Sequence, residues 1–394
     1  MKLTRVITAA LLAGSVAAPA FAGDDAVLNS YAHTGSKGKI KVTLYGQVNP
    51  AMIYIDDGLD SEMFFAMNDA SSDRLGLKAK GKIDDKWSGG AKIEYQFEQS
   101  ASDKIEFNDA SAGVGVTPDM RKLEFWLENS DLGKISLGLG DMASNGSAES
   151  DLSGTKSLGY ANVDAHLEDV NFVVNGVRNG AQIEDFIKME DGHSRQRRVR
   201  YDTPSIAGFT ASAAWGWQQG ANNNTNTAVG GGAIVRDEYL YDVALRYAGE
   251  VAGMKVKAAA AHAWNLGATK NNDVTDLSVS VLSPMGLNFT AAWEGRDRPT
   301  GQVDSDVYYT KLGYQTKELC DWGKTSFAAE YSWSDDFNNT QGNEGTIIGL
   351  GVVQKVKALN SELYLGWRRY EAENAANTAF EDIDSITIGG KVKL

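Results

Sequence analysis

The sequence predicts an all-β fold: a transmembrane antiparallel up-and-down β-barrel of sixteen strands, with short periplasmic turns and long extracellular loops. Three observations predict it. Apolar and polar side chains alternate along many segments, and the gaps between those segments alternate between long and short. After residue 22, no apolar run approaches the ~18 residues of a membrane-spanning helix. In lipid, only helices and closed barrels satisfy every backbone hydrogen-bonding group.

The alternation is clear in residues 91–98, where Ala, Ile, Tyr and Phe take turns with Lys, Glu, Gln and Glu. This pattern gives a strand one apolar face and one polar face. Sixteen segments share the pattern, and their expected spans are 40–55, 73–83, 88–99, 121–128, 134–140, 197–203, 207–218, 237–248, 252–264, 274–283, 286–295, 306–316, 323–333, 344–357, 360–370 and 383–394.

The gaps between these segments indicate a meander. Odd-numbered gaps are long or medium, and even-numbered gaps are tight, with 317–322 as the exception. Long loops at one end and short turns at the other are typical of outer-membrane barrels. The alternative is a secreted soluble sandwich or lectin. Segments of roughly 10–12 residues favour the barrel, because soluble strands average ~5–6 residues. Tryptophans near the segment ends also favour it, since they fit the aromatic girdles at membrane interfaces.

Residues 1–22 are typical of a secretory signal peptide. Lys2 and Arg5 supply a positive start, a short apolar stretch follows, and Ala20-Phe21-Ala22 forms an A-x-A cleavage site. The predicted organisation is a signal peptide at 1–22, a short lead segment at 23–39 and the barrel at 40–394, whose longest loop is 141–196.

Composition excludes several classes of function. The formal charge is -14, and removing Lys2 and Arg5 with the signal peptide makes the mature chain more negative still. Nucleic-acid binding needs a basic surface, so we predict none. Cys320 is the one cysteine, and the four histidines form neither a metal-ligand spacing nor a catalytic group with a nucleophile. We therefore predict no enzymatic activity, no cofactor and no metal.

Several stretches carry a resemblance to a known family, and their order and spacing strengthen it. They are VTLYGQVNPAMIYIDDG (42–58), SSDRLGLKAKGKI (71–83), ISLGLGDMASNGSAESDLSGT (135–155), RRVRYDTPSIAGFTASAAWG (197–216) and SITIGGKVKL (385–394). Together they resemble Gram-negative general porins, most closely the α-proteobacterial type. One departure is the terminal Leu394, where the family usually has an aromatic residue that the barrel-assembly machinery reads. The other is the unusual length of the third loop, 141–196.

The resemblance implies a homotrimer in the bacterial outer membrane, in contact with membrane lipid and lipopolysaccharide. Each barrel would enclose a water-filled pore for passive diffusion of ions and small hydrophilic solutes. The third loop would fold into the lumen and narrow that pore, and a loop of this length in a compact domain is usually functional.

Charged residues are the candidates for the constriction. The acidic candidates all lie in the third loop and are Asp141, Glu149, Asp151, Asp164, Glu168 and Asp169. The basic candidates lie on the barrel wall and are Arg74, Lys78, Arg121, Arg198 and Arg200. Alternation places Arg198 and Arg200, and likewise Arg74 and Lys78, on the polar faces of their strands. The resemblance adds Arg121 and again supports Arg74. Alternatively, such arginines pair with carboxylates only to hold the loop.

The acidic excess predicts a weak preference for cations at low salt, where charges are least screened. A substrate-specific channel for sugars or anions on the same fold is the main alternative. A non-conducting structural or adhesin barrel is the other.

Overall fold

The computed structural model describes residues 29–35, 38–98, 100–107, 117–218, 238–265, 273–317 and 319–394. The predicted signal peptide and most of the predicted loops 219–236 and 265–273 lie outside these residues. Within the described part, no helix has the length and apolar character to cross a membrane.

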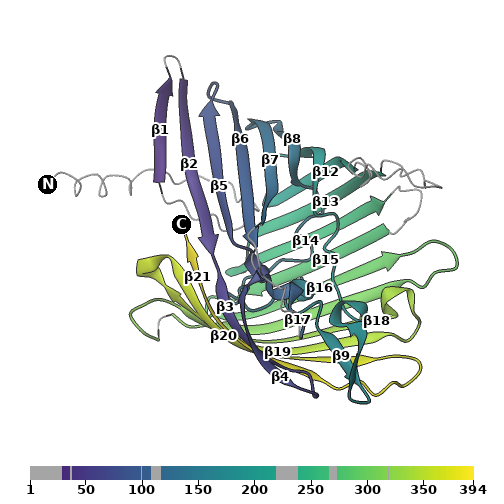
Figure 1. Ribbon diagram of the computed structural model, residues 1–394. Coiled ribbons are helices and arrows are strands. Elements are labelled where there is room, and N and C mark those ends of the chain that lie inside the picture. Colours follow the sequence, from purple (N-terminus) through teal and green to yellow (C-terminus); the bar gives the residue numbers. More distant parts are fainter. Residues whose placement is uncertain are drawn as a thin grey trace.

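The described strands form one closed antiparallel barrel of sixteen wall strands, as the sequence predicts (Figure 1). Two wall strands are each split: the first into β2 (Gly38–Val48) and β3 (Pro50–Asp56), the second into β4 (Ser61–Met67) and β5 (Arg74–Lys82). The others are β6 (Trp87–Glu98), β7 (Thr117–Asn129), β8 (Gly133–Asp141), β11 (Arg195–Asp202), β12 (Phe209–Gln218), β13 (Glu238–Val251), β14 (Met254–Asn265), β15 (Asp273–Leu282), β16 (Leu287–Asp297), β17 (Ser305–Gln315), β18 (Thr325–Asp335), β19 (Glu344–Val356), β20 (Ser361–Glu373) and β21 (Ile383–Lys393). β21 pairs with β3 and with the end of β2, which closes the barrel.

Outside the third loop, two strands fall where the sequence predicts none. β4 occupies part of the expected loop 56–72 and pairs with β3. β1 (Asn29–Gly35) lies in the expected lead segment 23–39 and pairs with β2. Both were missed because a short strand next to a long loop carries little alternation to count.

The first two wall strands are interrupted at the same height. Pro50 has no N–H to donate to a ladder, and Asn49 beside it turns inward instead. In the facing strand, residues 68–73 leave the ladder and contain the 3₁₀ turn η1 (Asp69–Ser71), capped by the Asn68 side chain. The Asn49 amide donates to the Asn68 and Ser71 carbonyls, both at 3.1 Å, so the two interruptions stabilise each other. We call residues 68–73 the wall insert.

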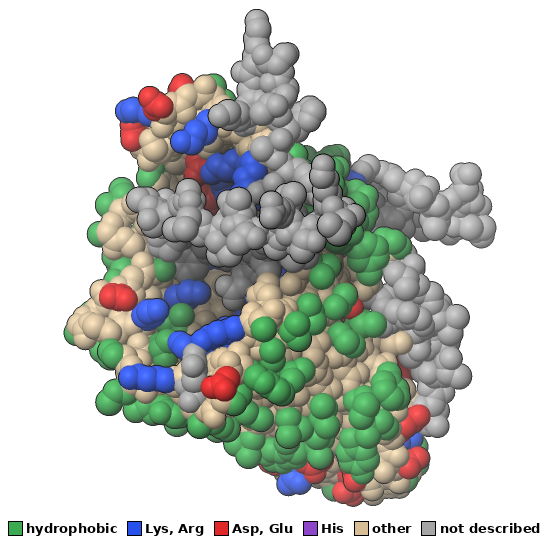
Figure 2. Space-filling model, turned by 90° about the vertical axis from the view of Figure 1, so that its left-hand side faces the viewer, with side chains coloured by type: hydrophobic (Ala, Val, Ile, Leu, Met, Phe, Trp, Pro, Cys, Tyr) green, Lys and Arg blue, Asp and Glu red, His purple; other side chains and the backbone are tan. Residues whose placement is uncertain are grey.

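The outer face of the barrel is apolar, as a lipid-facing wall requires. Large hydrophobic side chains such as Phe125, Leu245 and Phe289 are exposed there. Aromatic pairs stack across neighbouring strands, for example Tyr308 on Trp333 at 5.1 Å between ring centroids. Figure 2 shows hydrophobic side chains spread over the outer wall, with Lys and Arg side chains gathered in its hollowed part.

The third loop, 142–194, packs against the inner face of the barrel. It contains η3 (Val163–Ala165), the hairpin β9 (Asn171–Val174) and β10 (Val177–Gln182), and η4 (Ile183–Asp185). Its buried side chains, including Leu167 and Phe172, share the largest apolar core with inner-wall residues such as Ile53 and Ile347. Each such side chain contributes about 1.5–3 kcal/mol when fully buried. The core therefore lies between the loop and the wall and fixes the loop in place.

Candidate functional site

The third loop covers one sector of the inner wall. Its residues form hydrogen bonds with β13, β15 to β18, β20 and β21; for example, Ser144 donates to Asp242 and Ser157 donates to Glu362. The side chain of Asn68, at the start of the wall insert, also donates to the Ser157 carbonyl at 2.8 Å. β8 and β11 meet the loop where it begins, at Asn145 and Met142, and β5 to β7 lie outside the contacts described above. The rest of the loop and this sector therefore border the open lumen.

Basic side chains gather on the uncovered sector. Lys78 and Lys92 are direct register partners on β5 and β6, and like charges directly opposite each other destabilise a sheet. Their ammonium groups lie over aromatic rings, Lys78 over Trp126 at 5.8 Å and Lys92 over Tyr45 at 4.8 Å. Lys92 also lies 3.4 Å from Glu94 on its own strand, which partly offsets the repulsion between the two lysines.

The same surface extends to β7 and β11. The Nε atom of Arg121 lies 2.9 Å from Glu94, and Lys122 pairs with Asp141. Arg195, at the start of β11, is electrostatically coupled to Arg121 and Asp141. We call the whole group the basic wall cluster, and it consists of Arg74, Lys78, Lys92, Arg121, Lys122 and Arg195. The carboxylates next to this cluster are Asp73, Glu94, Asp141 and Glu124. Glu124 is the register partner of Lys92 and also pairs with Arg198, so the net charge of the cluster stays positive.

The acidic candidates of the third loop are held by cations of their own. Asp151 lies 2.9 Å from Lys311 on β17, and Glu149 pairs with Lys156. Burial alone would raise the pKa of Asp151, but Lys311 and hydrogen bonds from Ser153 hold that pKa below its usual range. The Asp151 carboxylate is therefore charged, and its charge is neutralised locally.

Glu168 and Asp169 lie farther along the loop. Glu168 pairs with Lys104 and Lys188, and Asp169 lies 3.3 Å from Lys104. The side chain of Asp164 lies outside the described residues. The oxygens of Glu168, Asp169 and Glu184 come within 4.8 Å of one another, the spacing of a metal site. Lys104 and Lys188 already occupy this group as its counter-ions.

Arg198 and Arg200 fix the beginning of the third loop and do not pair with Glu149 or Asp151. Arg198 pairs with Glu124, and its Nε donates to the Asp141 carbonyl at 2.9 Å. Arg200 pairs with Asp202 at 2.7 Å, and its Nη1 donates to the Met142 carbonyl at 2.7 Å.

Several charged residues that shape this site were missed from the sequence. Lys92 and Lys122 stand on the polar faces of their strands, so alternation alone would have found them. Lys311, Glu330 and Arg368 carry the same signal on later strands, where they meet the third loop. The path of the third loop decides which charges face the loop and which face the lumen. No local sequence pattern reveals that path.

A closed antiparallel barrel with an apolar outer face, a charged lumen and a loop folded across it defines a membrane channel. Residues 8–375 match the model of the Gram-negative porin family, and the chain belongs to this family. It is an outer-membrane porin, a channel for passive diffusion of small hydrophilic solutes, and the family and fold are those of non-enzymatic channels. Among curated protein sequences, none matches the chain significantly.

Solved structures with the same fold are distant in sequence. The anion-selective porin of Comamonas acidovorans is 15% identical, with a TM-score of 0.58, and the match covers 90% of this chain and 100% of that one. The outer-membrane expressed OmpT of Vibrio cholerae is 15% identical, with a TM-score of 0.56, over 94% and 100% of the two chains. The OmpF of Salmonella typhi, solved with daunomycin, is 13% identical, with a TM-score of 0.55, over 90% and 98%. At these identities, the likeness shows the fold alone.

Proposed function

We propose that this porin is a general diffusion channel with a weak preference for anions, and that the basic wall cluster sets this preference. The net negative charge of the whole chain would instead favour cations. Only charges within about one Debye length, ~10 Å at 0.1 M salt, act strongly on an ion in the constriction. The charges that border the open lumen therefore count for more than the total.

The observation that carries the proposal is the uneven pairing of the two sides. The cluster sets six basic side chains against four carboxylates, and one of these four, Glu124, also pairs with Arg198. The third-loop carboxylates Asp151 and Glu168 each have a lysine within ion-pair distance. An ion passing between the two sides meets a positive wall and a loop whose described candidate carboxylates are paired.

A reversal potential tests this. The purified porin is placed in planar bilayers across a potassium chloride gradient at low salt. We expect a sign that reports chloride preference, which should weaken as the Debye length falls to ~3 Å at 1 M. A potential of the opposite sign would contradict the proposal and would show the cation preference that the composition predicts.

We also propose that the chain forms a homotrimer surrounded by outer-membrane lipid and lipopolysaccharide. One solved structure of the Vibrio cholerae OmpT is described as a trimer form. Extraction in mild detergent should give the mass of three chains with conductance retained. A conducting single chain would contradict this assembly.

A further inference from the structure

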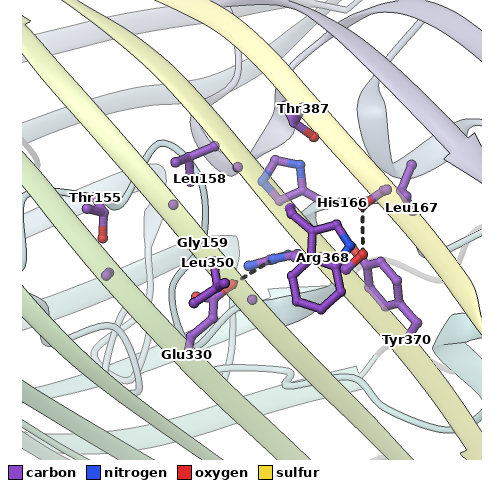
Figure 3. A pocket seen from close by; sticks show the side chains of 16 residues that line it. Thr155, Leu158, Gly159, His166, Leu167, Glu330, Leu350, Arg368, Tyr370 and Thr387 are labelled. Atoms are coloured by element: carbon purple, nitrogen blue, oxygen red, sulfur yellow. Dashed lines mark hydrogen bonds and ion pairs between the residues drawn. The ribbon is translucent and has the colours of Figure 1, made fainter.

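A small cavity lies where the third loop meets β18 to β21 (Figure 3). On the wall side, Gly349, Gly351 and Gly366 leave space at positions where a side chain would point inward. Leu158 of the loop fills part of this space, because a Cβ built on Gly351 would lie 2.5 Å from its Cδ1 atom. The remaining space for the centre of a water-sized sphere is about 20 Å³. A water molecule needs roughly 10–15 Å³ by this measure.

Three buried side chains present unsatisfied polar atoms to this cavity. Among the described residues, Nε2 of His166 has no hydrogen-bond partner, and no hydrogen bond of good geometry reaches Nη1 or Nη2 of Arg368 or the hydroxyl of Tyr370, although Arg368 and Tyr370 lie close enough to interact. These side chains are 6%, 1% and 4% exposed, so bulk water does not reach them. A buried polar atom left without a partner costs about 1–3 kcal/mol. The Arg368 guanidinium and the Tyr370 hydroxyl can partly satisfy each other, but Nε2 of His166 and the remaining Nη atom of Arg368 are left over, which indicates that something small occupies the cavity.

The charges around the cavity are balanced. The Nε atom of Arg368 lies 2.7 Å from Glu330, and Lys311 nearby is paired with Asp151. Two cations therefore face two carboxylates, and an ion added to the cavity would have no counter-charge. A neutral occupant fits this environment better, because an isolated buried charge is costly.

The cavity is lined by both hydrogen-bond donors and hydrogen-bond acceptors. The His166 ring already hydrogen-bonds the backbone of Leu158, and burial, reinforced by Arg368, lowers the pKa of His166 well below its usual value. The ring is therefore neutral at physiological pH, and its free Nε2 carries a lone pair that accepts a hydrogen bond. The free Nη atoms of Arg368 can only donate. The occupant must therefore both accept and donate.

We propose that this cavity is a site for an ordered water molecule that joins the third loop to β20. The water accepts a hydrogen bond from an Nη group of Arg368, donates one to Nε2 of His166, and completes its bonding with the hydroxyl of Tyr370. Buried waters typically make about three such bonds to groups that otherwise lack partners. Chloride can only accept, so it would face the lone pair of His166. The water therefore positions the loop segment 155–167 on the wall.

A crystal structure of the porin purified from outer membranes tests the occupant. Crystals grown in sodium bromide should show a peak about 2.6–3.2 Å from His166 Nε2 and from an Arg368 Nη atom. The peak should carry no anomalous signal of bromide. A bromide signal would assign the site to anions and overturn the proposal. An empty cavity, or direct contact between His166 and Arg368 that closes it, would also overturn it.

A variant tests the role of the water in holding the loop. His166→Leu removes the acceptor, so the water peak should disappear and amide exchange across 155–167 should quicken about tenfold, close to the effect of one lost hydrogen bond. Thr387→Ser is the matched control, because Thr387 lines the same cavity and serine keeps the hydroxyl. It should retain both the water and the wild-type exchange. A water with unchanged occupancy and exchange in His166→Leu would show that the imidazole does not bind it.

Discussion

The ammonium group of Lys311 lies 2.9 Å from the carboxylate of Asp151, with side-chain exposures of 1% and 2%. Lys311 comes from the barrel wall and Asp151 from the third loop, so this ion pair joins the two. Lys311 also donates to the carbonyl of Gly159, farther along the loop. The loop is therefore held at two points by one buried side chain.

Replacing one partner of this pair should loosen the third loop. Lys311→Met leaves Asp151 as a buried charge without its cation, which typically costs about 3–5 kcal/mol. We expect a lower unfolding temperature and a noisier single-channel current. The double variant Lys311→Met with Asp151→Leu should recover much of the loss, because a buried pair replaced by apolar residues is often neutral. A single variant with the stability and quiet current of the wild type would contradict the role of the pair.

Neutralising the basic wall cluster should move selectivity toward cations. Lys92→Gln with Lys122→Gln removes two positive charges and retains side chains of similar length. We expect the reversal potential at low salt to shift toward the equilibrium potential of potassium. Lys257→Gln is the matched control, because it removes one charge from β14, outside the cluster. A shift of equal size per charge in the control would show that the preference does not depend on the cluster.

Acid should weaken the attachment of the third loop around Glu168. Burial raises the pKa of Glu168, but Lys104 and Lys188 lower it more, so the pKa lies below its usual value of about 4.3. A carboxyl with a lowered folded pKa stabilises the fold above its unfolded pKa, and that stability is lost as pH falls through the folded pKa.

The unfolding temperature should therefore fall as pH drops below about 4. Glu168→Gln should be less stable at neutral pH and should lose part of this dependence. Glu62→Gln, an exposed position on β4, should keep the wild-type profile. Parallel profiles for Glu168→Gln and the wild type would exclude Glu168 as a source of the acid sensitivity.

Gly138 on β8 should not tolerate a side chain. Its φ is +119°, and a Cβ there would lie 2.3 Å from the Leu123 carbonyl oxygen. Gly138→Ala should destabilise the barrel by about 1–3 kcal/mol. The loss is measured as a lower unfolding temperature, on gels that separate folded from unfolded barrels. Gly390→Ala is the control, because its nearest contact is a Leu363 side-chain atom at 3.3 Å. Equal losses in both variants would argue against backbone strain at Gly138.

The wall of the barrel could be predicted from the sequence because each strand alternates between lipid and lumen. Predicted segments such as 88–99 and 344–357 agree with β6 and β19 to within one residue at each end. The same pattern cannot distinguish an inner wall that faces water from one that faces protein. Ile53 and Ile347 point inward and are fully buried, because the third loop covers them.

The positions of the constriction charges could be predicted only in part. Alternation assigns Arg198 to the polar face of its strand, but it does not show that its partner is Glu124 on β7, on the far side of β8. Partners such as Asp151 and Lys311 are 160 residues apart in the sequence and meet only through the path of the loop. No local spacing records such a meeting, so the pairing had to come from the structure.

The wall insert changes what limits the width of this channel. Asn68 donates to the Ser157 carbonyl of the third loop at 2.8 Å and to the Tyr364 hydroxyl at 3.0 Å. The loop is thus supported by the wall insert between β4 and β5 as well as anchored at its own ends. Six residues that belong to neither a membrane strand nor the third loop therefore share control of the aperture.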